Sequence, residues 1–232
     1  MSGEDKLDVD GILNDGVPYY EADARRLQSY VDAADELSRF QSPVLVHSGS
    51  PHERLYVAAF DGTGNDEVKD PDHRTNVAKI HDQIEALVSH GNRQIDAGYI
   101  PGPGTQDSYL ARTLDGITGN TYDERIEQMY KLFIDKAWEW KKADPQAEIR
   151  LADIGFSRGS EQAAGFARLV HERGIQDPSG AIYTRDRHGQ IKHVEYTRSP
   201  LVEPGQVAQA VGLFDAVGTG EPVRDHDRRL PP

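Results

Sequence analysis

The chain has 232 residues, no cysteine and a formal net charge of −13 at pH 7. Its length is sufficient for one sizeable α/β domain, and the lack of cysteine excludes disulfides, thiol catalysis and cysteine-ligated zinc. Nucleic acid is not expected as a partner, because the negative surface field repels phosphate backbones.

The first 50 residues are acidic and interrupted by glycine and proline. One run within them, from Glu21 to Phe40, has apolar residues at helical spacing, which predicts an N-terminal arm or linker (1–50) with a docking helix. The N-terminus is polar, and no stretch approaches the ~20 consecutive apolar residues of a membrane span. We therefore expect no Sec-type signal, no membrane span, and a main domain at residues 51–232.

The first half of the main domain alternates between strand and helix patterns. The apolar residues 55–60 predict a buried strand that ends at a glycine-rich loop. Thr75 or Asn76 can cap a helix, and a second strand is expected near residues 94–100. Residues 123–142 have apolar side chains on one face and charges on the other, which predicts a long amphipathic helix.

The second half continues the alternation. A strand is expected at residues 148–154, then a sharp turn at 155–159 and a helix. Residues 181–197 have the pattern of a hairpin, and residues 207–214 predict another buried strand that ends on Asp215. The order predicts an α/β fold with a mostly parallel sheet, helices on both faces and functional residues at the carboxyl ends of the strands.

The sharpest motif is G-x-S-x-G at Gly155 to Gly159. It lies between a predicted strand and a predicted helix, as the nucleophile elbow of an α/β-hydrolase requires. The glycines are needed because larger side chains would collide with the helix and the strand in so tight a turn. We interpret Ser157 as the nucleophile; the alternative is a glycine-bounded turn with an incidental serine.

A serine nucleophile needs an oxyanion hole, and two segments can supply its donors. The amide of Arg158 opens the helix after the serine, where backbone N–H groups and the helix dipole favour negative charge. The loop with Gly62 and Thr63 follows an earlier strand, and glycine allows its backbone to approach a reacting carbonyl. The alternative for this loop is a tight turn without a catalytic role.

The other two members of a catalytic triad should follow the serine, in the order acid and then histidine. Asp215 ends a predicted strand and is the candidate acid; the alternative is a helix cap or turn aspartate. Only His226 follows it, so His226 is the candidate base, with a solvent-exposed tail histidine as the alternative. One more strand normally separates the two, and we expect this chain to lack the C-terminal strand and helix that carry the base.

These motifs together resemble the catalytic domain of the type VI secretion phospholipase effectors, an α/β-hydrolase family that also occurs in fungi. The resemblance covers about residues 55 to 220. The matching segments are Phe60 to Asp66, Thr75 to Val77, Pro101 to Thr105, Gly155 to Ser160 and Gly212 to Thr219. Two departures are Ser160, where the family usually has alanine, and the missing later region with the family's histidine.

The resemblance implies a function. Members hydrolyse acyl esters of phospholipids with a Ser-Asp-His triad, in which Ser157 and Asp215 match the nucleophile and the acid. It implies a carboxylic ester hydrolase of the lipase or phospholipase A type that needs no cofactor. It also implies a toxin that is made in the cytoplasm and secreted without a Sec signal into a target cell, with an immunity protein or a secretion-apparatus component as partner.

Two other functions are suggested by parts of the sequence. The sequence Asp61-Gly62-Thr63 also resembles the phosphatases of the haloacid-dehalogenase type, but their nucleophilic aspartate would stand at position 59, which is Ala59. A catalytically incomplete hydrolase scaffold that acts as a binding module stays open as the alternative function.

A metal site is not expected. The acidic and histidine side chains nearest one another in sequence fall in one short stretch, which more simply forms a solvated acidic loop. They are Asp66, Asp70, Asp72 and His73.

Overall fold

The computed structural model describes residues 23–39, 41, 44–62, 74–102, 122–185, 187 and 191–216. The chain forms two compact units, residues 1–43 and residues 44–232. In the first unit, helix α1 (Ala24–Arg39) occupies the run that was predicted to be helical. Several of its apolar side chains are exposed, among them Leu27, Tyr30 and Val31, at 55%, 73% and 57%.

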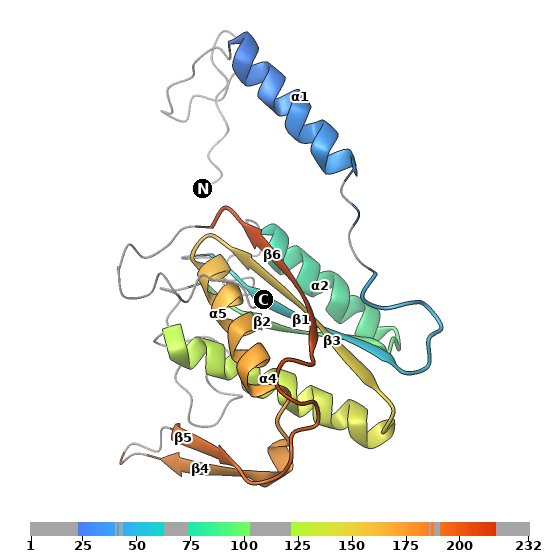
Figure 1. Cartoon of the computed structure of the whole chain (residues 1–232), viewed down its shortest axis with the longest axis vertical. Helices are drawn as coiled ribbons and strands as arrows, with labels where there is room; N and C mark the ends of the chain where they lie inside the picture. The colour runs from blue at the N-terminus through green and yellow to red at the C-terminus, as the bar shows by residue number, and fades with distance from the viewer. Residues whose placement is uncertain are drawn as a thin grey trace, which may run out of the picture. The chain divides into compact units, whose positions relative to one another are not determined.

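The second unit is built on a four-stranded sheet. Strands β1 (Glu53–Phe60), β2 (Ile95–Ile100), β3 (Glu148–Phe156) and β6 (Ala208–Phe214) lie in the order β2-β1-β3-β6. Every neighbouring pair is parallel, so the carboxyl ends of all four strands meet at one edge (Figure 1). The predicted α/β fold with a parallel sheet is confirmed.

Helices cover both faces of this sheet (Figure 1). Helix α2 (Asn76–Ser89) packs on one face, and α4 (Tyr122–Ala143) and α5 (Arg158–Arg173) pack on the other. Coverage on both sides explains why the last five residues of β1 are all buried and apolar in sequence. On the α4 and α5 side, the ring of Phe166 lies 5.6 Å from that of Phe60 and 6.2 Å from that of Phe133.

The predicted hairpin is present but is separate from the main sheet (Figure 1). A short 3-10 turn, η2 (Pro178–Gly180), leads into β4 (Ala181–Arg185), which pairs antiparallel with β5 (Ile191–Tyr196). The Tyr196 ring packs edge-on against Tyr130 of α4, at 6.4 Å between centroids. This contact holds the hairpin against the helix layer.

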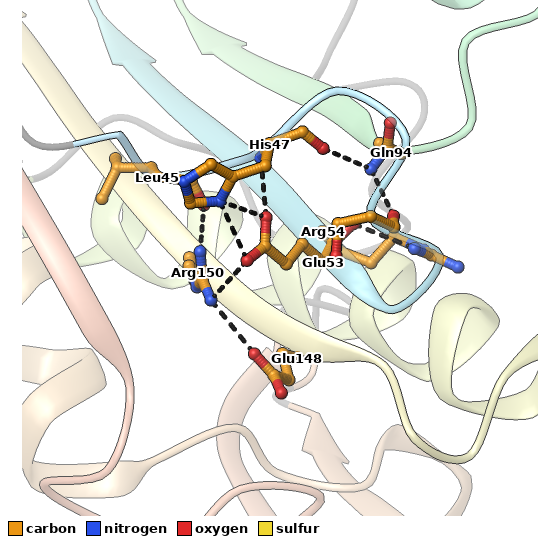
Figure 2. A network of polar contacts seen from close by, with 8 residues as sticks. Leu45, His47, Glu53, Arg54, Gln94, Glu148 and Arg150 are labelled. Carbon is orange, nitrogen blue, oxygen red and sulfur yellow. Dashed lines mark hydrogen bonds and ion pairs between the residues drawn. The ribbon is translucent and has the colours of Figure 1, made fainter.

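A polar network fastens the segment at residues 44–52 to the amino ends of β1 and β3 (Figure 2). The Glu53 carboxylate accepts a hydrogen bond from the backbone N–H of His47 at 2.6 Å and pairs with Arg150 at 2.9 Å. Gln94 donates to the carbonyl of His47 at 3.2 Å. The backbone N–H of His47 is the main reason that the pKa of Glu53 is lowered. Because the network lies at the amino ends of the strands, it is remote from the edge where the predicted site residues lie.

Candidate active site

Ser157 lies between β3 and α5, at the tip of a strand-to-helix turn. Its backbone has φ 54° and ψ −123°, in the positive-φ region that residues with a side chain seldom adopt. Among the described non-glycine residues, only Ser157 and Asp215 (φ 47°) have a positive φ. Strain of this kind concentrates at functional sites, and here it falls on the two residues predicted to be nucleophile and acid.

The two glycines of the motif allow three backbone segments to meet. A Cβ at Gly155 would lie 2.5 Å from the carbonyl oxygen of Gly159, in the first turn of α5. A Cβ at Gly159 would collide with the carbonyl oxygen of Phe60 and lie 2.6 Å from that of Asp61. The first turn of α5 therefore packs directly on the backbone at the ends of β1 and β3, which explains the glycine at each position.

We expect Gly159→Ala to lower the free energy of unfolding by ~3 kcal/mol, because the added methyl group meets backbone that cannot move aside cheaply. Urea unfolding measures the loss. Gly165→Ala is the matched control in the same helix: its methyl group would meet the Tyr122 hydroxyl and Ile126 Cδ1, the ends of side chains that can rotate. Equal losses in the two variants would contradict the packing argument.

The elbow is also bonded to the end of β6. The backbone N–H of Ser157 donates to the carbonyl of Phe214 at 2.9 Å. The Ser160 hydroxyl lies 3.0 Å from the same carbonyl and 2.8 Å from that of Gly155, and donates to one at a time. Since Phe156 and Phe214 are paired in the sheet, Ser157 and Asp215 follow at matching positions on neighbouring strands. The Asp215 side chain is exposed.

On the other side of β3, the end of β1 carries Asp61 and Gly62. Phe60 pairs with Gly155, so the residues after them also lie at this edge. The Asp61 carboxylate is 1% exposed and accepts hydrogen bonds from the Gly62 N–H at 2.7 Å, the Thr75 hydroxyl at 2.9 Å and the Tyr99 hydroxyl at 2.6 Å. Ser157, Asp215 and Gly62 thus come from three adjacent strand ends, with Arg158 opening α5 between them.

One family matches most of the chain: "T6SS, Phospholipase effector Tle1-like, catalytic domain", over residues 54–229. The chain belongs to this family. Among curated proteins none matches it. Membership confirms the resemblance predicted from the sequence motifs, and the matched range includes every strand of the parallel sheet except the first residue of β1. In open α/β sheets, ligands bind outside the carboxyl ends of the strands, which is the edge where the elbow lies.

Not every site residue predicted for this family member can be placed. Ser157, Arg158, Gly62 and Asp215 lie at the same edge of the sheet. Thr63 and His226 fall outside the described residues, and so do Asp66, Asp70, Asp72 and His73. The roles of nucleophile, acid, base and oxyanion donor all stay predictions. Within the described part of the chain, no cluster of three or more histidine, aspartate or glutamate side chains could hold a metal ion.

One cavity of the second unit lies away from this edge. A space of about 690 Å³ lies between α4, the end of α5 and the hairpin, lined by residues that include Glu127, Arg173 and Tyr196. Glu127 and Arg173 pair with each other across it at 2.6 Å. None of the predicted site residues lines this cavity, and we locate the candidate active site by the elbow geometry instead.

Sequence reasoning missed one buried group close to the elbow, Asp153 in β3. Its side chain is fully buried, and neither carboxylate oxygen has a hydrogen-bond partner among the described residues. Burial raises the pKa of this carboxyl well above its ordinary value. A signal was available: Leu151, Asp153 and Gly155 alternate along a strand, which puts them on one face of the sheet.

Proposed function

We propose that the chain is a serine ester hydrolase that cleaves acyl esters of phospholipids, with Ser157 as nucleophile and Asp215 as triad acid. The observation that carries the proposal is the strained backbone of Ser157, at φ 54° between a parallel strand and the first turn of a helix. That geometry exposes a serine hydroxyl at the end of a sheet, which is how α/β-hydrolases present a nucleophile.

The proposed reaction has two halves. The Ser157 hydroxyl oxygen attacks the acyl carbonyl carbon, its proton passes to a histidine base, and the alcohol leaves with that proton. Water then attacks the acyl-serine ester by the same route and releases the fatty acid. Asp215, on the next strand end, would orient the base and stabilise its charged form; His226 is the candidate for that base.

The negative charge that develops on the carbonyl oxygen needs donors. The amide of Arg158 stands at the amino end of α5, a helix of 16 residues, so its N–H group and the helix dipole favour an anion there. We assign the second donor to the loop at Gly62 and Thr63; because the Gly62 N–H donates to Asp61, the N–H of Thr63 is the candidate. The close packing of Gly159 on the Phe60 and Asp61 carbonyls supports that assignment, because it places the residue just before Gly62 against the elbow.

Membership of a phospholipase effector family supports a lipid substrate and delivery into a target cell by the secretion apparatus. An immunity protein is the further partner that we propose, since a cell that makes a phospholipase toxin must protect its own lipids. In the described portion of the chain, no helix is long and apolar enough to cross a membrane.

A fluorophosphonate probe tests the proposal, because it reacts only with an activated serine hydroxyl. In the full-length protein we expect the label on the peptide that contains Ser157, identified by mass spectrometry. Ser157→Ala should not be labelled, whereas Ser160→Ala should be. Absence of label in a folded wild-type protein would reject the hydrolase and favour the alternative, a hydrolase scaffold that binds a partner.

A further inference from the structure

We propose that Asp61 is a positioning residue for the reaction at Ser157: its buried carboxylate fixes the loop after β1 against the first turn of α5. This inference rests on the proposed function, and it names a residue that positions the backbone donors of the proposed oxyanion hole. The carboxylate acts through the loop backbone and does not touch the substrate.

The three donors to Asp61 come from three different segments. One is the N–H of Gly62 in the loop itself, the second is the hydroxyl of Thr75, and the third is the hydroxyl of Tyr99 in β2. Thr75 is also the N-cap of α2, where its hydroxyl oxygen accepts from the N–H of Ala78 at 3.1 Å. One carboxylate therefore joins β1, β2, α2 and the loop at a single point.

The Asp61 backbone contacts both β2 and the elbow. Its N–H donates to the carbonyl of Ile100, the last residue of β2, at 3.0 Å, which continues the pairing of the two strands one residue past the end of β1. Its own carbonyl oxygen would lie 2.6 Å from a Cβ at Gly159, two residues after the nucleophile. The residue that the three donors immobilise is thus the residue on which the elbow packs.

The Asp61 carboxylate bonds to groups on the side of the sheet opposite α5. Thr75 and Tyr99 belong to the α2 side of the sheet, whereas α5 packs on the opposite side. The carboxylate is directed away from α5, is 1% exposed and is surrounded by donors, so neither proton transfer nor metal binding suits it. Because Gly62 donates its N–H to Asp61, this amide is not available to an oxyanion while that bond is intact.

A buried carboxylate is a costly way to stabilise a core, because desolvation opposes its charge and hydrogen bonds only offset that penalty. An apolar residue would fill the same space without the cost. What the carboxylate adds is a fixed backbone geometry, and an oxyanion hole depends on geometry because its donors must be in place before the charge develops.

The test is Asp61→Asn in the full-length protein, assayed on a soluble short-chain p-nitrophenyl ester. The amide has the same size but carries N–H groups of its own, so it cannot accept all three hydrogen bonds. We expect kcat to fall about 100-fold with KM nearly unchanged, because the oxyanion exists only in the transition state. Labelling by the fluorophosphonate should slow by a similar factor.

Tyr99→Phe and Tyr130→Phe form a matched pair. Each removes one buried tyrosine hydroxyl, but Tyr99 bonds to Asp61 and Tyr130 bonds to the carbonyl of Gly174, away from the elbow. Both variants should lose similar stability, and only Tyr99→Phe should lower kcat. If Asp61 had only a structural role, the two variants would have the same kcat.

The outcomes separate the two proposals. If Ser157→Ala is inactive but Asp61→Asn keeps its kcat, or loses activity only in proportion to unfolded protein, the positioning role is wrong and the proposed function stands. If Ser157→Ala keeps its turnover, the proposed function fails and the role of Asp61 fails with it.

Discussion

Replacement of Ser157 with alanine should reduce ester hydrolysis by the full-length protein by ~10³-fold or more while the fold stays intact. The hydroxyl is the proposed nucleophile, and without it only substrate binding and the oxyanion donors remain. Its loss should not destabilise the protein, because within the described residues the Ser157 side chain caps no N–H group of α5. Initial rates on a short-chain ester at saturating concentration measure the effect.

Ser160→Ala is the control for this substitution. The Ser160 hydroxyl is buried against the carbonyls of Gly155 and Phe214, so its loss should cost about 1 kcal/mol of stability and little activity. The family resemblance supports that expectation, because alanine is usual at this position. Near-normal turnover by Ser157→Ala would discard the elbow assignment.

Local sequence patterns were sufficient to predict the elements that build the elbow. Residues 55–60 are apolar without alternation, and β1 is indeed buried on both faces. The spacing of Gly155, Ser157 and Gly159 reflects steric demands within five consecutive residues, so no long-range information was needed. The same holds for the hairpin, whose two strands and turn are contiguous in sequence.

Longer-range features were not predictable in this way. The sheet order β2-β1-β3-β6 depends on which strands pair across the domain, and no local pattern encodes that choice. The hydrogen bonds to Asp61 come from Gly62, Thr75 and Tyr99, which are brought together only by the parallel pairing of β1 and β2 and by the start of α2. Sequence reasoning therefore identified the Asp61 loop but not the carboxylate that fixes it.

The Asp153 carboxyl, which is buried without a hydrogen-bond partner among the described residues, leads to a second large effect. Asp153→Asn should be more stable than the wild-type protein at neutral pH. Burial raises the pKa of Asp153 in the folded state, so the folded protein holds this proton where the unfolded chain, with a pKa of about 3.9, releases it. Stability from the protonated group is complete below the unfolded-state pKa and falls as pH rises toward the folded-state pKa. Between the two pKa values the free energy of unfolding falls by about 1.4 kcal/mol per pH unit. The amide that Asp153→Asn introduces does not titrate, so the variant does not lose this stability.

Urea unfolding of both proteins between pH 4.5 and 8 measures this difference, which should be small at the acidic end and grow with pH. Asp144→Asn is the control with the opposite sign. Its carboxylate bonds to His52 at 2.9 Å, and chiefly through that bond its pKa is lowered, so its contribution is present at neutral pH and lost as pH falls through the folded-state pKa. Asp144→Asn should therefore be less stable than wild type at pH 7. If Asp153→Asn were destabilised at pH 7 as much as Asp144→Asn, the Asp153 carboxylate would have to be ionised and to have a partner.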